Sequence, residues 1–179
     1  MMPDSKPVVF PENFRAGVVR ETDHGWCWIL GDKMRPVIDS RTTGGGFDLF
    51  ESHTAWGAGP PPHLHTQADE MFIVQAGRMR FLLDRDWITA GPGDVVYVPR
   101  HTVHTFRGAD KHGSRMLIHV SPGNFSAFVQ EASTPEHACG PTGVEPTEAA
   151  IGKLMGECAR HDIDMRPTWE TNGAWDEGL

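Results

Sequence analysis

The sequence predicts an all-β domain with minor α content, built as a sandwich or barrel of short strands and ending in helices. Short runs rich in β-branched and aromatic residues recur between residues 26 and 120, and Gly, Pro or Asp separates them. Many short strands at even spacing are typical of such folds. After residue 123 the signals become helical, with an apolar stripe at helical spacing between Thr147 and His161. We therefore expect one domain: an N-terminal arm (1–24), a barrel (25–122) and a helical C-terminal extension (123–179) packed on the barrel.

The composition is that of an ordinary globular protein, and it excludes several classes of partner. The chain has 179 residues, of which 39% are hydrophobic and 22% charged, enough for one domain with a real core. The net charge is −8, without a Lys/Arg-rich run, which argues against nucleic acid and anionic membranes as partners. No apolar stretch approaches the ~20 residues of a membrane helix, and the start lacks a signal-peptide pattern.

Cysteine usage indicates a reducing compartment. The chain has three cysteines, Cys27, Cys139 and Cys158, an odd number at wide spacing. None has zinc-site spacing, so we expect reduced thiols in a cytoplasmic protein.

The first strands follow the N-terminal arm. Pro3, Pro7 and Pro11 exclude a helix from that arm, and we expect it to cover a sheet edge, such as one of a neighbouring subunit. The alternation of apolar residues through 26–30 predicts the first strand. The next two strands are predicted at Met34–Ser40 and Phe47–Thr54.

The strand at Phe47–Thr54 has two distinct faces. Asp48, Phe50, Ser52 and Thr54 share one of them. The other carries Glu51 and His53, which could hold the outer nitrogens of metal-bound histidines. A solvated face with chance charges explains the same pattern, and both interpretations stay open.

The remaining elements follow from the same signals. Further strands are predicted at Met71–Gln75, Arg78–Leu83, Trp87–Thr89, Asp94–Val98 and Met116–Val120. Asn124 can cap a short helix. A second helix is predicted from Thr147 to His161, because four apolar residues recur at i, i+3, i+4 and i+7: Ile151, Leu154, Met155 and Cys158. The tail from Asp162 has no clear periodicity.

Candidate metal ligands lie in two stretches, 57–77 and 93–108. His63 and His65 are two residues apart, so on a strand both imidazoles point to one face. Glu70 begins the next apolar run, and a hairpin through 66–69 would bring its carboxylate over the imidazoles. If the strands pair across a barrel, His104 adds a third imidazole. Such a set suits one divalent transition metal ion, such as Fe, Ni, Mn, Co, Cu or Zn. The roles of His53, His101 and His119 stay open.

These stretches resemble the two motifs of the cupin family. The first, G-x5-H-x-H-x4-E-x6-G, is complete, with the residues Gly57, His63, His65, Glu70 and Gly77. The second, G-x5-P-x-G-x2-H-x3-N, is matched at Gly93, Pro99 and His104, while His101 replaces the Gly and Gly108 the Asn. The motifs cover about a third of the chain. The resemblance implies a single-domain cupin β-barrel or jelly roll.

The chain looks most like single-domain cupins similar to quercetin 2,3-dioxygenase. That resemblance implies His63, His65, Glu70 and His104 as metal ligands, with Glu70 also as the catalytic base that takes a hydroxyl proton. The implied activity is a metal-dependent oxygenation, with O2, of a flavonol, a polyphenol or another enolisable aromatic or polyketide compound. Small cupins also resemble one another in forming homodimers, by pairing sheet edges or exchanging N-terminal arms.

Two other functions fit the same residues. One is a redox-neutral cupin cyclase or isomerase in a biosynthetic pathway; oxygen uptake distinguishes it from an oxygenase. The other is a non-catalytic cupin that binds a small molecule, which is disfavoured because no output element such as a helix-turn-helix accompanies the barrel. Beside the ligands, the expected substrate pocket comprises Phe50, Phe72, Phe106, Trp56 and His101, although plain core packing also explains the aromatic residues.

Overall fold

The computed structural model describes residues 17–20, 25–29, 32–133 and 148–170. The predictions for most of the N-terminal arm, for the loop up to residue 146 and for Cys139 lie outside these residues. Cys27 and Cys158 are buried free thiols, and burial raises their pKa values to about 12 and about 11. Neither of the two described helices has the length and apolar character needed to cross a membrane.

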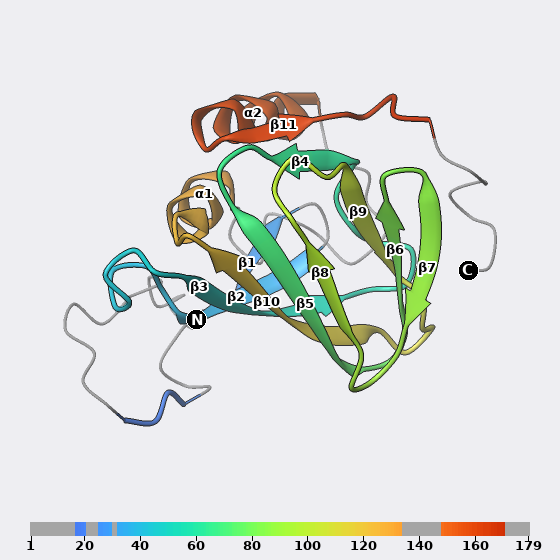
Figure 1. The fold of residues 1–179 in the computed structure, drawn as a ribbon, viewed down its shortest axis with the longest axis horizontal. Coiled ribbons are helices and arrows are strands. Elements are labelled where there is room, and N and C mark those ends of the chain that lie inside the picture. The colour runs from blue at the N-terminus through green and yellow to red at the C-terminus, as the bar shows by residue number, and fades with distance from the viewer. Residues whose placement is uncertain (1–16, 21–24, 30–31, 134–147, 171–179) are drawn as a thin grey trace, which may run out of the picture.

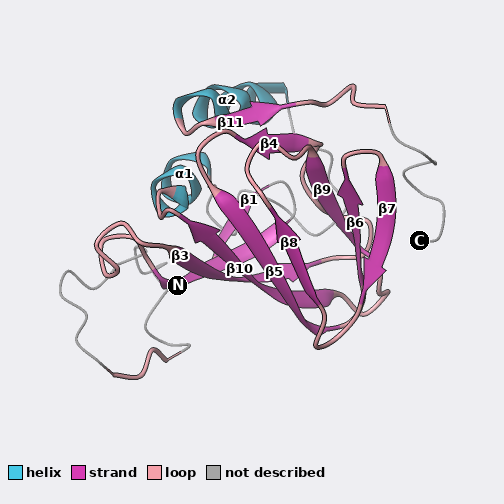
Figure 2. Ribbon diagram, viewed as in Figure 1, coloured by secondary structure: helices cyan, strands magenta, loops and turns pink. Residues whose placement is uncertain are grey.

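The predicted mostly-β architecture with two helices near the C-terminal end is confirmed (Figures 1 and 2). The strands are β1 Cys27–Ile29, β2 Asp32–Ile38, β3 Asp48–Thr54, β4 His63–His65, β5 Asp69–Ala76, β6 Met79–Leu83, β7 Asp86–Ala90, β8 Val95–Val98, β9 His104–Gly108, β10 Ser114–Ser121 and β11 Ile163–Met165. The helices are α1 Phe125–Ala132 and α2 Glu148–Arg160. Most observed strand ends lie within one or two residues of the predicted ones.

The strands form two antiparallel sheets that enclose one core. One sheet has the order β1-β2-β3-β10-β5-β8 and the other the order β11-β4-β9-β6-β7. The chain repeatedly leaves one sheet for the other, for example from β5 to β6 and from β9 to β10. Strands that are distant in sequence therefore become neighbours, which is the arrangement of a jelly roll.

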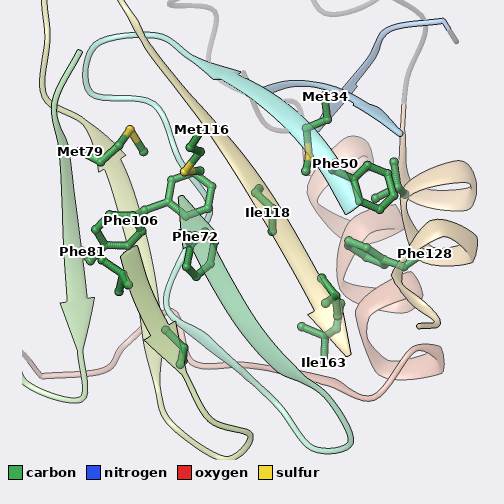
Figure 3. Packing of buried hydrophobic residues seen from close by; sticks show 14 of the residues in the cluster. Met34, Phe50, Phe72, Met79, Phe81, Phe106, Met116, Ile118, Phe128 and Ile163 are labelled. Atoms are coloured by element: carbon green, nitrogen blue, oxygen red, sulfur yellow. The ribbon is translucent and has the colours of Figure 1, made fainter. Parts of the chain in front are cut away.

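Alternation along the strands fills the space between the sheets with aromatic and aliphatic side chains. Phe72, Phe81 and Phe106 gather there with ring centroids 5.2–6.3 Å apart (Figure 3). The predicted two-faced character of β3 is also confirmed, because Asp48, Phe50, Ser52 and Thr54 are buried and the residues between them are not.

The predicted apolar stripe of α2 is only partly buried. Leu154 and Cys158 are buried, whereas Ile151 and Met155 are exposed. The reason is that α2 lies at the end of the barrel, where it contacts α1 and β11 rather than a broad sheet face (Figure 1). Packing against these two elements therefore buries only one narrow face of the helix.

The sequence did not predict β11. This strand pairs antiparallel with β4, with Ile163 opposite His65 and Met165 opposite His63. It covers the edge of β4, which would otherwise present unpaired backbone groups. The C-terminal extension is therefore not purely helical, and it supports the strand that carries two of the candidate metal ligands.

Candidate metal centre

Four side chains with metal-ligating atoms converge between the two sheets. Each of His63, His65, Glu70 and His104 offers one ligand atom, and these atoms lie within 4.8 Å of one another. The histidines come from neighbouring strands, since β4 pairs with β9 and places His63 directly opposite His104. The structure thus brings together the ligand set that the motifs suggested.

The predicted hairpin between the histidines and Glu70 is wrong. β4 and β5 belong to different sheets, so residues 66–68 cross from one sheet to the other. Within its own sheet Glu70 pairs with Val120 and Val98. Its carboxylate therefore faces the imidazoles from the opposite wall of the barrel, a position that a hairpin would not give.

Backbone carbonyls fix the orientation of two imidazoles. Nδ1 of His63 lies 3.0 Å from the carbonyl oxygen of Pro61, and Nδ1 of His104 lies 3.0 Å from that of Thr102. A carbonyl oxygen only accepts hydrogen bonds, so Nδ1 carries the proton of each neutral ring. The lone pair of each Nε2 is then free to bind a metal ion.

Glu70 completes a set of acceptor atoms that needs a cation or a proton. Its Oε2 lies 2.6 Å from Nε2 of His104 and 3.4 Å from Nε2 of His65. A carboxylate oxygen and an imidazole lone pair repel each other at such a distance unless a positive charge lies between them. Nε2 of His65 is moreover buried without a hydrogen-bond partner. Three imidazoles and one carboxylate fit a divalent transition metal ion.

The electrostatic environment favours the protonation states that metal binding requires. The four side chains are at most 9% exposed. Burial, assisted by the His104 and His65 imidazoles, lowers the pKa of His63 to about 3. Burial acts to raise the pKa of Glu70, but the adjacent imidazoles of His65 and His104 hold this pKa well below its usual range. A neutral imidazole and an ionised carboxylate are the forms that bind metal ions.

A cavity of about 60 Å³ extends from this centre into the barrel. Its wall includes His63, Glu70, Phe72 and Phe106, and both helices and β11 contribute the residues that close it: Phe125, Phe128, Leu154, Cys158, Ile163 and Met165. The cavity is therefore largely apolar, with two of the candidate ligands, His63 and Glu70, in its wall.

The proposed pocket residues occupy different places. Phe72 and Phe106 line the cavity. Phe50 is fully buried and packs edge-on against Phe125, with ring centroids 5.5 Å apart. Trp56 and His101 are exposed and are not part of the cavity wall.

His101 instead supports β4 through its backbone. Its N–H donates a hydrogen bond to the carbonyl oxygen of His65, and its φ of 69° lies in the left-handed region. That conformation favours glycine, the residue usual at this motif position.

Glu51 and His53 do not support the metal ligands. They project from the other face of β3, where Glu51 accepts hydrogen bonds from Arg35 (2.8 Å) and His53 (3.1 Å). His119 likewise lies on the outer side of β10 and stacks on Phe47, with ring centroids 5.1 Å apart.

Sequence reasoning missed one polar residue of the cavity, Asp32. Its side chain is buried and lines the same cavity as His63 and Glu70. The predicted strand begins at Met34, two residues later. The signal that could have revealed Asp32 is its two-residue spacing from Met34, because both side chains then face one side of the strand.

Comparison with known proteins identifies one family and one curated relative. The model of the cupin domain family matches residues 51–120. Quercetin 2,3-dioxygenase from Bacillus subtilis (strain 168) is 30% identical over 118 residues, which cover 65% of this chain and 35% of the relative. The matched part thus spans about a third of the length of that enzyme.

Solved structures share the fold. KdgF from Halomonas sp. aligns with a TM-score of 0.56 and 20% identity, over 63% of this chain and 99% of that chain. The polyketide cyclase RemF from Streptomyces resistomycificus aligns with a TM-score of 0.52 and 23% identity, over 60% of this chain and 80% of that chain. At these identities the likeness concerns the fold alone.

Proposed function

We propose that this chain, whose residues 51–120 match the cupin domain family, is a metal-dependent enzyme that oxygenates a flavonol, a polyphenol or another enolisable aromatic or polyketide compound. The main observation that supports this proposal is the convergence of four side chains beside an apolar cavity: His63, His65, Glu70 and His104. A divalent metal ion, when bound there, would supply Lewis acidity and a position for a substrate oxygen. The sequence similarity to quercetin 2,3-dioxygenase supports this choice of reaction.

The cavity suits a substrate with an apolar body and a polar end. Phe72, Phe106 and Ile118 offer aromatic and aliphatic surface for the rings, and His63 with Glu70 offers the polar contact. A cavity of about 60 Å³ holds only roughly four to six water molecules at ~10–15 Å³ each. A compound with two or more rings therefore requires the covering side chains of α1, α2 and β11 to move aside.

Glu70 is the proposed base. Its carboxylate is buried, and the neighbouring imidazoles keep its pKa well below the usual range despite that burial, so it is ionised at neutral pH. A substrate hydroxyl bound beside the three imidazoles would lie next to this carboxylate. Glu70 then accepts the hydroxyl proton, and the resulting anion is the form of an enolisable compound that reacts with O2. A positioned base of this kind contributes about 10²–10⁴-fold to the rate.

The same residues would serve a redox-neutral cyclase or isomerase, since enolisation by Glu70 requires no oxidant. A third function is binding without turnover.

The test of the proposed function is metal analysis of the purified protein together with an oxygen-electrode assay in the presence of quercetin. Oxygen consumption in proportion to quercetin loss supports the oxygenase. Conversion of a substrate under nitrogen would instead indicate a redox-neutral enzyme. Binding of a substrate without conversion would indicate a binding protein.

A further inference from the structure

One polar side chain of the cavity lies apart from the metal centre. Asp32, the first residue of β2, is 3% exposed and lines the cavity together with Ile29 and Met34. Besides Asp32, the ionisable wall residues are His63 and Glu70 of the metal centre and the thiol of Cys158. An apolar cavity thus contains a carboxyl group that the proposed reaction does not use.

The immediate surroundings of Asp32 leave one carboxyl oxygen without a partner. Oδ2 accepts a hydrogen bond from the Ser52 hydroxyl at 3.1 Å, and that hydroxyl lies 3.2 Å from the Thr54 hydroxyl. Oδ1 is buried and has no hydrogen-bond partner. A buried polar atom left in this state costs roughly 1–3 kcal/mol, so we expect a water molecule or a ligand to occupy the position beside it.

Sheet register separates Asp32 from the metal centre. Asp32 pairs with Thr54, which pairs with Ser114 at the start of β10. Glu70 pairs with Val120 near the end of the same strand. The two carboxyl groups are therefore offset by six residues along β10, which places them at different levels of the barrel. The cavity therefore has two polar positions separated by apolar wall.

We propose that Asp32 is a substrate-binding residue that hydrogen-bonds to an oxygen of the substrate remote from the metal centre. This inference rests on the proposed function and narrows its substrate class. The substrate would be an elongated ring compound with oxygen functions at both ends. One end meets His63 and Glu70, the other meets Oδ1 of Asp32, and the apolar side chains between them contact the rings.

The charge balance around Asp32 supports hydrogen-bond donation. Burial raises the pKa of Asp32 to about 7, although the Thr54 and Ser52 hydroxyls and the Arg107 guanidinium act to lower it. Arg107 is itself engaged with the carbonyl oxygens of Pro60 (2.6 Å) and Phe106 (2.8 Å). A substantial fraction of Asp32 is therefore protonated near neutral pH, and a protonated carboxyl donates to a hydroxyl or carbonyl oxygen without burying a charge.

The test compares two ligands that share the metal-facing end. Quercetin and 3-hydroxyflavone both carry the hydroxyl and keto groups of a flavonol, but only quercetin has further hydroxyls. Dissociation constants are measured for the full chain under nitrogen, by quenching of tryptophan fluorescence. In Asp32→Leu we expect quercetin to bind about 3- to 10-fold more weakly, the worth of one hydrogen bond, with 3-hydroxyflavone unchanged. Asp32→Asn, which can still donate, should retain most of the affinity.

Met34→Leu is the matched control, because it alters the same strand and the same cavity without a polar change. It should leave the ratio of the two dissociation constants unchanged. An equal loss for both ligands in Asp32→Leu, or no loss for either, overturns the proposal. If Asp32→Leu fails to fold, infrared spectroscopy of the unaltered protein tests the proposal instead. A protonated-carboxyl band that Asp32→Asn removes must shift when quercetin binds, and a band that does not shift overturns the proposal.

Failure of the proposed function has a different signature. If the unaltered protein binds neither flavonol, the assigned substrate class is wrong, and phenol and toluene then test Asp32 alone. By saturation-transfer NMR we expect a preference for phenol over toluene that Asp32→Leu abolishes and His63→Ala preserves. The absence of that preference in the unaltered protein, or its persistence in Asp32→Leu, overturns the role of Asp32.

Discussion

The carboxylate of Asp48 accepts a hydrogen bond from the backbone N–H of Ser126, 78 residues further along the chain, at 3.1 Å. Ser126 lies in the first turn of α1, where backbone N–H groups have no partner within the helix. The other carboxylate oxygen accepts from the N–H of Ser40. One buried side chain of β3 thus fixes the start of the helix that closes the cavity.

Replacing Asp48 by Ala should therefore destabilise the protein more than a normal cap mutation. Two backbone N–H groups lose their partner, at about 1–3 kcal/mol each when buried, so we expect a loss of roughly 2–6 kcal/mol in the free energy of unfolding. Urea denaturation measures it. Asn124→Ala is the control, because the Asn124 side chain makes no capping hydrogen bond, and its effect should stay within about 0.5 kcal/mol. Equal effects of the two substitutions would refute this account of the cap.

The same helix start shows what the sequence could and could not predict. Asn124 was the expected cap because capping residues are recognised by their place next to the helix. It does occupy the N-cap position. The residue that satisfies the first turn is Asp48, and only the tertiary fold brings it there. Local signals predict where an element begins, whereas the partner that stabilises it can come from any part of the chain.

The candidate ligands, in contrast, were predictable because most of them lie close together in the sequence. His63, His65 and Glu70 stand at fixed spacing within a single motif, so the sequence displays them together. Their geometry was not predictable, because the short connection at 66–68 is as compatible with a hairpin as with a crossing between sheets. β11 escaped prediction because three residues are too few for a period, and pairing with β4 alone makes them a strand.

Removal of two imidazoles should abolish metal binding. We expect the purified double variant His63→Ala/His104→Ala to contain far less than one equivalent of metal by inductively coupled plasma mass spectrometry. The remaining His65 and Glu70 are too few ligands to hold the ion. The double variant His53→Ala/His119→Ala removes two imidazoles outside the centre and should keep a full equivalent. A full equivalent in the first variant would refute the assigned ligand set.

Glu70→Gln separates metal binding from proton transfer. The amide keeps the size of the side chain and an oxygen donor but loses the basicity of the carboxylate. We expect metal content to be retained and turnover to fall by at least ~10²-fold, the lower end of what a general base contributes. Glu51→Gln, on the outer face of β3, serves as the control for turnover. Unchanged turnover with metal retained would make Glu70 a structural ligand and would favour a binding function.

The protein is expected to form a homodimer. β8 is an edge strand among the described residues, and its Val95 and Tyr97 side chains are 56% and 59% exposed. A second copy that pairs with this edge would bury them together with the unpaired backbone groups. Light scattering at micromolar concentration should give twice the monomer mass, and Tyr97→Lys should reduce it. A monomer mass for the unaltered protein would count against the dimer.

Asp32 should make the stability of the protein depend on pH in an unusual direction. Burial raises the pKa of Asp32 from 3.8 to about 7, so the folded state retains a proton that the unfolded state has already released. Stability contributed by this group is complete below pH 4, falls as the pH rises towards 7 and changes little above that. The full loss is on the order of 4 kcal/mol, since each pH unit between the two pKa values contributes about 1.4 kcal/mol. Asp32→Asn removes the ionisation and hence this loss.

The measurement is the difference in unfolding free energy between Asp32→Asn and the unaltered protein, from urea denaturation at pH 5 and pH 8. Other titrating groups, including the histidines of the metal centre, are present in both proteins and cancel to first order in this difference. We expect the variant to gain stability relative to the unaltered protein on going from pH 5 to pH 8, by up to about 3 kcal/mol. Asp162→Asn, which neutralises an exposed carboxylate at a position of positive φ that Asn tolerates, is the control for the same chemical change outside the cavity. A pH-independent difference for Asp32→Asn would mean that Asp32 is ionised throughout this range, and its hydrogen-bond donation to the substrate would then be lost as well.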